Sequence, residues 1–196
     1  MVRIAHLYPE ELCLYGENGN IKALVYALKE KGIDSSIINV SKGDKLELDT
    51  YDFIYIGSGL EKNLGRIKER LIPYKEDFLR YIKLDKPILI TGNALAIFDF
   101  LDKYEIEEYK EYKVADVVAT SSICSGNIYG FQNTKYMIKS TNHLLFQMIN
   151  GYGNQNLGME GYHEHEMVVT SIIGPILARN ISLTNYFVNV IIEATR

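Results

Sequence analysis

The sequence is poor in the features of secreted, disulfide-bonded and membrane-spanning proteins. Its 196 residues include only two cysteines, Cys13 and Cys124, which lie far apart and form no CxxC pair. Neither a disulfide framework nor a cysteine metal site is therefore expected. No apolar run reaches the length of a membrane span, and the chain does not start with a signal-peptide pattern. We expect a cytoplasmic protein with reduced thiols.

Positive charge is also scarce. The chain has 21 Lys and Arg against 25 Asp and Glu, which gives a formal net charge of −4 spread along the sequence. Because nucleic-acid binding depends on basic residues that neutralise phosphates, we expect no nucleic-acid partner. Apolar residues make up 47% of the chain, enough for a substantial core, and the length suits a single domain over residues 1–196.

The first half of the chain alternates between strand and helix patterns. We predict strands and helices in the order strand 2–7, helix 21–31, strand 33–40, strand 52–56, helix 63–82 and strand 88–91. Gly32 is expected to close the first helix, and Pro73 to interrupt the second. This alternation favours an α/β protein with a parallel sheet covered on both faces.

The second half has a different sequence pattern. Four short β-type runs, separated by Gly, Asn and Ser, are predicted at 113–119, 127–131, 136–140 and 167–173. We expect them to form sheet extensions and hairpins. A closing helix is predicted over 182–195, with Ser182 as its N-cap.

The segment 87–98, PILITGNALAIF, has the most informative pattern. It predicts a buried strand, a tight turn and then a helix, which is where a nucleophile sits in many α/β hydrolytic folds. No Cys or Ser stands at the tip of this turn. A second loop, Gly57-Ser58-Gly59, ends the preceding strand, and its small residues would let a ligand approach the backbone.

Six blocks of sequence together resemble one family. They are LYPEELCLYGENGN at 7–20, IGSGLE at 56–61, GFQN at 130–133, GYGN at 151–154, EG at 160–161 and GPILARN at 174–180. In this order the chain resembles CobB/CobQ-like class I glutamine amidotransferases, and in particular the GatD subunits of lipid II isoglutaminyl synthase, which work with a Mur-ligase-like MurT subunit. The resemblance implies a flavodoxin-like fold with a mainly parallel sheet, helices on both faces and a β-rich C-terminal half.

The resemblance also implies that the reacting residues are missing. The family's catalytic Cys, which attacks the carboxamide of glutamine, falls on Gly92, and the family's catalytic His falls on Ile173. Ala96, Gln132 and Thr134 replace a Gln, a Glu and a His of the family pattern. Glycine cannot form a thioester and isoleucine cannot carry a proton. We therefore expect a GatD-like subunit without glutaminase activity, which binds a Mur-ligase-like (MurT-type) or other synthetase partner.

Two alternatives stay open. In one, Cys13 or Cys124 serves as nucleophile in an active amidotransferase subunit that supplies ammonia to a cell-wall precursor or a cobyrinate-type substrate. Around Cys124 the sequence shows no cation or helix start that would activate the thiol, whereas Cys13 lies in a loop on the ligand side of such sheets. In the other, the chain is a free-standing binder of a small amide or amino acid.

Backbone N–H groups near Gly59 and at Gly92-Asn93 are expected to face such a ligand. Asn93 itself is predicted to cap the following helix. The candidate cleft residues are Gly57, Ser58, Gly59, Gly92, Asn93, Cys13 and Asn20, with Tyr15, Glu17 and Asn18 beside them.

No cofactor and no metal are expected. His163 and His165, with Glu164 or Glu166, supply too few ligands for a complete metal site. His6 lies within the first predicted strand and is interpreted as a hydrogen-bonded core residue.

Overall fold

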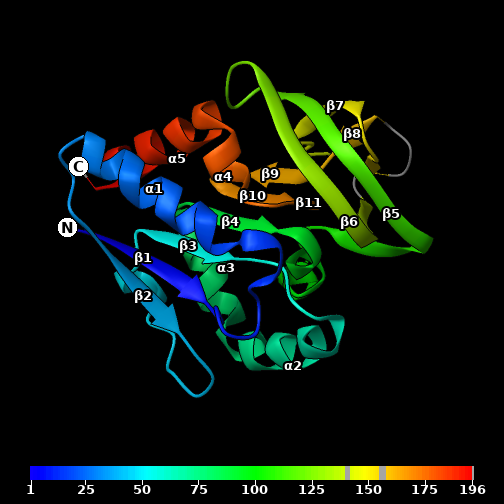
Figure 1. Ribbon diagram of the computed structural model, residues 1–196. Coiled ribbons are helices and arrows are strands. Elements are labelled where there is room, and N and C mark those ends of the chain that lie inside the picture. Colours follow the sequence, from blue (N-terminus) through cyan, green and yellow to red (C-terminus); the bar gives the residue numbers. More distant parts are fainter. Residues whose placement is uncertain (140–141, 155–157, 196) are drawn as a thin grey trace.

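Parallel strands form the centre of the molecule (Figure 1). The computed structural model describes residues 1–139, 142–154 and 158–195. Sheet A has the order β2-β1-β3-β4-β10-β9, in which β9 alone is antiparallel to its neighbour. Its strands are β1 (Val2–Leu7), β2 (Ser35–Val40), β3 (Phe53–Ile56), β4 (Ile88–Thr91), β9 (Tyr162–Glu164) and β10 (Met167–Thr170). The predicted parallel sheet is confirmed.

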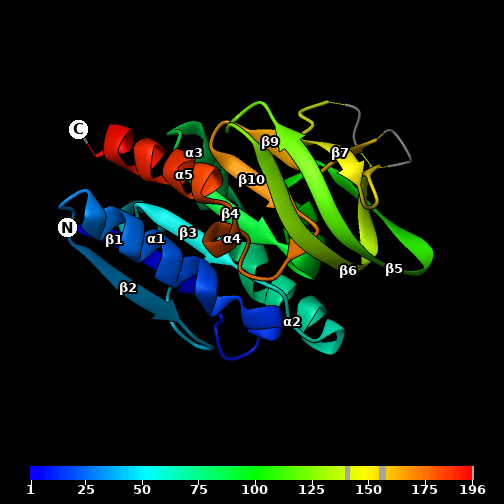
Figure 2. The ribbon, with the colours of Figure 1, turned by 45° about the horizontal axis from the view of Figure 1, so that its top comes forward.

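Helices cover both faces of sheet A, which explains the continuous apolar runs in its central strands. Helices α1 (Asn18–Glu30) and α5 (Ile181–Ala194) lie over one face (Figure 2). Their buried side chains belong to the same core cluster as Ile4 and Phe53. On the other face, α2 (Glu61–Leu71) and α3 (Lys75–Lys83) pack against alternate residues of the same strands. The 3-10 turn Ile72–Tyr74 separates α2 from α3, so the predicted interruption at Pro73 is confirmed.

Sheet B lies beside sheet A and is antiparallel throughout, with the order β11-β6-β5-β7-β8. Its strands are β5 (Glu105–Ser121), β6 (Asn127–Lys139), β7 (Phe146–Asn150), β8 (Met159–Glu160) and β11 (Ile172–Ile173). The runs predicted separately at 127–131 and 136–140 belong to one long strand, although Ser140 lies outside the described residues. The β-rich second half is confirmed.

Two local predictions are wrong, and one short helix was not predicted. The helix expected after Gly92 is instead two 3-10 turns, Gly92–Ala96 and Phe98–Leu101. Apolar residues at 94–95 and 97–98 are all fully buried, so this segment packs on every side and has no amphipathic stripe to favour a regular helix. The short helix α4 (Ile176–Arg179) was missed, and Asn180, not Ser182, precedes α5.

The side chain of Asn180 makes no helix cap. Its Oδ1 accepts a hydrogen bond from Tyr129 N at 2.8 Å, and its Nδ2 donates to Tyr129 O, also at 2.8 Å. Asn180 therefore pairs with β6 of sheet B through its side-chain amide, and this contact fixes the turn between α4 and α5.

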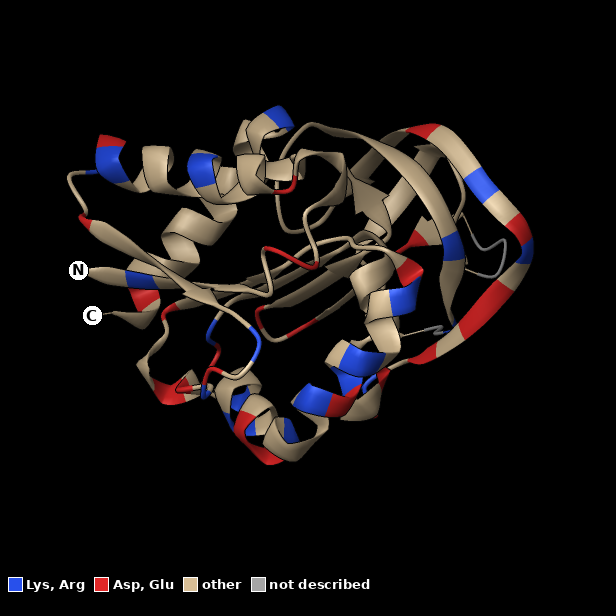
Figure 3. Ribbon diagram, turned by 60° about the horizontal axis from the view of Figure 1, so that its bottom comes forward, with Lys and Arg blue, Asp and Glu red and all other residues tan. Residues whose placement is uncertain are grey.

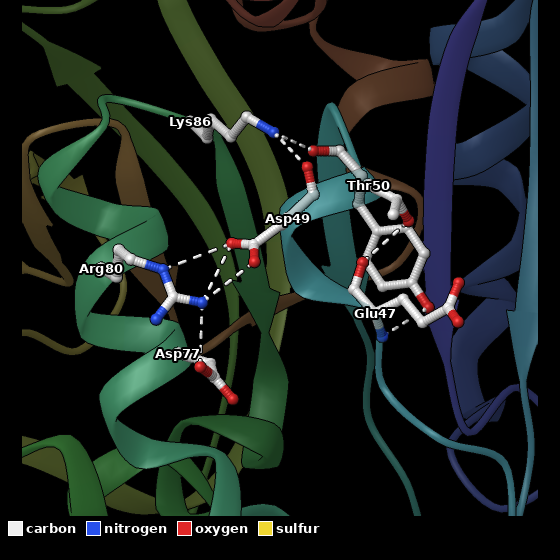
Figure 4. A network of polar contacts seen from close by, with 7 residues as sticks. Glu47, Asp49, Thr50, Asp77, Arg80 and Lys86 are labelled. Carbon is white, nitrogen blue, oxygen red and sulfur yellow. Dashed lines mark hydrogen bonds and ion pairs between the residues drawn. The ribbon is translucent and has the colours of Figure 1, made fainter.

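A second set of polar contacts lies around α3. Arg80 of α3 donates to both carboxylate oxygens of Asp49, at 3.0 and 3.1 Å, and forms an ion pair with Asp77 (Figure 4). Lys86 donates to the main-chain oxygens of Asp49 and Tyr51. These contacts hold the segment before β3 against α3 and the start of β4.

Surface charge is mixed. Acidic and basic residues lie next to one another along α2, α3 and β5 (Figure 3). Among the described helices, none is long and apolar enough to cross a membrane.

Candidate functional site

The chain turns sharply at Gly92, directly after β4. Gly92 has a φ of +60°, a conformation that favours glycine. A Cβ atom at this position would collide with Ser58 Oγ and lie 2.5 Å from Ile173 Cγ2. The two side chains therefore fill the space at the tip of this turn, and we call Gly92, Ser58 and Ile173 the filled elbow.

Sheet topology brings these three residues together. Thr170 at the end of β10 pairs with Thr91 at the end of β4, so the residues after both strands leave the sheet at the same edge. Ile173 follows in β11, where it pairs with β6 of sheet B. Ser58 follows β3, which also ends at this edge. The structure thus places the two positions predicted for nucleophile and base, Gly92 and Ile173, in direct contact.

The backbone groups of Ser58 and Gly59 are already hydrogen-bonded within the protein. Ser58 N donates to Glu17 Oε1 at 3.3 Å, and Ser58 O accepts from Leu14 N at 3.0 Å. Gly59 N donates to Asn93 Oδ1 at 3.0 Å, while Asn93 Nδ2 donates to Gly59 O at 2.7 Å. Asn93 is therefore not a helix cap, because its side chain is bound to the loop. The expectation of a free donor at Gly59 is wrong for the same reason.

The small residues of this loop let other parts of the chain close over it. A Cβ atom on Gly57 would lie 2.9 Å from both Glu17 Cγ and Tyr55 Oη. One on Gly59 would collide with Leu12 and lie 2.6 Å from the main-chain oxygen of Glu11. Glycine is needed here for close packing within the protein, whereas the sequence was interpreted as leaving room for a ligand.

A buried polar cluster lies directly beneath the loop. The carboxylate of Glu17, which is 0% exposed, accepts hydrogen bonds from Tyr55 Oη, from Thr91 Oγ1 at 3.0 Å and from Asn20 Nδ2 at 3.1 Å. Burial raises the pKa of Glu17, and the hydrogen bonds from Tyr55, Thr91 and Ser58 only partly oppose that effect. Asn20 also accepts from Leu177 N at 2.9 Å. It is fully buried and ties α1 to α4, so it does not line a cleft.

The remaining loop candidates are on the outside. Cys13, Tyr15 and Asn18 are exposed, and Tyr15 Oη accepts a hydrogen bond from Asn133 Nδ2 at 3.0 Å. This contact joins the loop after β1 to strand β6.

Neither thiol is among the atoms nearest to a Cβ at Gly92. Cys124 is half-buried beside Ser182 of α5, and burial raises its pKa, which is the opposite of activation. Cys13 is exposed. The atoms nearest to a Cβ at Gly92 belong to Ser58 and Ile173.

The histidines make separate contacts. His163 Nε2 lies 3.1 Å from Tyr186 Oη, and His165 Nδ1 lies 2.7 Å from Asp85. His6 is buried, its Nε2 has no hydrogen-bond partner among the described residues, and burial lowers its pKa to about 4. Within 1–139, 142–154 and 158–195, no group of three or more His, Cys, Asp or Glu residues is arranged to hold a metal ion.

Several blocks of the family pattern join the two sheets. Gln132 Nε2 donates to Ser171 Oγ at 2.9 Å, and its Oε1 accepts from Tyr152 N at 2.8 Å. The buried carboxylate of Glu160 accepts from Ser171 N at 2.6 Å and from Thr170 Oγ1 at 2.7 Å. Burial raises the pKa of Glu160. Nothing in the sequence indicated these contacts, because both partners are distant along the chain.

Comparison with known proteins agrees with this architecture. The chain is 28% identical to the lipid II isoglutaminyl synthase subunit GatD of Staphylococcus aureus, over 93% of this chain and 81% of that protein. It is 26% identical to GatD of Streptococcus pneumoniae, over 93% and 77%. The chain is a homologue of these GatD subunits. No protein-family model matches it.

The fold of this GatD-like chain is that of class I glutamine amidotransferases. A glutamine amidotransferase from Thermotoga maritima superimposes with a TM-score of 0.62 at 15% identity, covering 88% of this chain and 75% of that one.

Proposed function

We propose that this GatD-like chain is a glutamine amidotransferase-type subunit that does not hydrolyse glutamine and acts through a synthetase partner in the cytoplasm. The packing at the filled elbow is the main observation that supports this proposal. Gly92 stands where a nucleophile would project, and a side chain on it would overlap Ser58 and Ile173.

The chemistry of glutamine hydrolysis requires a nucleophile and a proton carrier that act as a unit. Gly92 has no side-chain atom to attack the carboxamide. Ile173 can neither accept a proton from a nucleophile nor return it to departing ammonia. The loss of either group removes most of the rate in such pairs.

Ser58 does not replace the nucleophile. Its hydroxyl is buried at the elbow beside the carboxylate of Glu17, but its Oγ makes no hydrogen bond of good geometry with any described residue. The carboxylate of Glu17 contacts the backbone N–H of Ser58 and is bound to Tyr55, Thr91 and Asn20. Its lone pairs are engaged in holding the loop in place.

Similarity supports a synthetase partner. Both curated relatives are named as subunits of a glutamine-hydrolysing lipid II isoglutaminyl synthase. We assign to this chain a partner of the Mur-ligase-like, MurT type, and a role in assembly or regulation of that enzyme.

The test is a glutaminase assay of the purified chain, alone and with a co-expressed Mur-ligase-like subunit, with Staphylococcus aureus GatD and its partner as positive control. We expect no release of glutamate or ammonia above background. Turnover that survives Cys13→Ala and Cys124→Ala would refute the inactive-subunit proposal. If turnover is instead abolished by one of these substitutions, that thiol is the nucleophile and the alternative of an active enzyme holds.

The partner is tested separately. Size-exclusion chromatography of the co-expressed proteins should give a stable complex. Two independent peaks would refute the assembly role and favour a free-standing protein.

A further inference from the structure

The carboxamide of Asn93 forms two hydrogen bonds with the backbone of Gly59. Its oxygen accepts from Gly59 N at 3.0 Å and its nitrogen donates to Gly59 O at 2.7 Å. The side chain of glutamine ends in the same functional group, with the same acceptor and the same two donors. Building on the proposed function, we infer that Asn93 is a built-in occupant of this site, so that the protein does not bind glutamine at its elbow.

The groups next to Gly59 in the loop are engaged within the protein as well. Both backbone groups of Ser58 are engaged, by Glu17 and Leu14. The space at the tip of the elbow is filled by Ser58 Oγ and Ile173 Cγ2. A glutamine would therefore need both a displaced Asn93 and a changed elbow.

Displacement is unfavourable because the internal contact is intramolecular. Asn93 is held beside Gly59 by the backbone at Gly92, so its carboxamide is present at a high effective concentration. The loop itself is pressed against Leu12 and the main chain of Glu11, which prevents it from moving away from Asn93. Free glutamine must compete with this contact and lose its own freedom of movement on binding.

Asn93 also connects two strands of the sheet. Gly59 follows β3 and Asn93 follows β4, so the pair of hydrogen bonds holds the ends of neighbouring strands together. The same residue thus closes the site and stabilises its shape.

The experiment is an amide NMR titration of the full-length chain with L-glutamine at millimolar concentrations, followed at the Gly59 amide and checked by calorimetry. The wild type should show no saturable shift. The opened variant Ser58→Gly/Asn93→Gly/Ile173→Ala should show one. Asn127→Ala, which changes an exposed asparagine on β6, is the matched control and should behave as the wild type.

Saturable binding of glutamine by the wild type overturns the inference. So does failure of a folded opened variant to bind. If the triple variant does not fold, hydrogen exchange of the Gly59 amide is compared between the wild type and Asn93→Gly. Exchange should be at least tenfold slower in the wild type, and equal rates overturn the inference. Binding without hydrolysis would overturn this inference alone, whereas hydrolysis would overturn the proposed function as well.

Discussion

The carboxyl edge of sheet A and the outer face of sheet B differ in how far their side chains are exposed. At the edge of sheet A, the positions where catalysis would take place are as buried as the core, with Ser58 and Ile173 at 1% exposure. On sheet B, by contrast, Tyr112, Val114 and Tyr129 are each at least 50% exposed. A region that is packed like a core contributes to stability, whereas an accessible apolar face is free for contact with other molecules.

The largest effect that separates the two regions should come from Gly92→Ala. The added methyl group would overlap Ser58 and crowd Ile173 at a positive φ, so we expect the free energy of unfolding to fall by about 4 kcal/mol. The matched control is Gly126→Ala. Gly126 has a φ of +77° but open space around it, so this change should cost only about 1 kcal/mol. Equal losses in urea denaturation would show that the elbow is not tightly filled.

A second effect concerns His6, which lies in β1 and contacts the ring of Tyr55. Because its pKa is lowered from 6.5 to about 4, the unfolded chain binds the proton more readily than the folded one. Stability is therefore lost as the pH falls from 6.5 to 4. We expect the wild type to lose about 3 kcal/mol more than His6→Gln over this range. The measurement is urea denaturation at several pH values, and parallel curves for the two proteins would contradict the prediction.

Glu17 should act in the opposite direction. Burial raises its pKa in the folded state, so folding favours the protonated form and stability is lost as the pH rises above the ordinary value of 4.5. The variant Glu17→Gln should gain relative to the wild type by up to about 1.4 kcal/mol for each pH unit within the affected range. A difference between wild type and Glu17→Gln that is constant with pH would refute a buried titrating carboxyl group.

The smallest effect is expected on sheet B. Tyr112 Oη donates to Glu61 Oε1 at 2.5 Å, but the ring is 52% exposed. Tyr112→Phe should change the unfolding free energy by no more than about 0.5 kcal/mol. A loss comparable with that of Gly92→Ala in thermal or urea unfolding would mean that the outer face is structural after all.

The sequence predicted the parts of the fold that depend on local patterns. Strand β1 was predicted with its observed bounds, and the break at Pro73 follows from the chemistry of proline. Contacts between distant side chains were not predictable in this way. The pairing of Asn93 with Gly59 and that of Glu17 with Tyr55 depend on the arrangement of loops, which leaves no periodic signal.

For the candidate site, the sequence singled out residues but did not predict their contacts. Gly92 and Ile173 were singled out by resemblance, and they are neighbours in space. Asn93 was assigned to a helix cap because asparagine favours that role, yet the segment forms a 3-10 turn that has no side-chain cap. Three-dimensional packing, and not the preference of the residue type, decided the role of Asn93.

The amide of Asn180 has a consequence for solubility. Strand β11 has only two residues and pairs with β6 at Gln132 and Phe131, so the ladder would otherwise stop before Tyr129. By bonding to both N and O of Tyr129, the side chain of Asn180 continues that ladder like an additional strand residue. Unpaired backbone N–H and C=O groups at the edge of a sheet can pair with a strand of another chain. At Tyr129 the side chain of Asn180 occupies both groups and so disfavours self-association at this point.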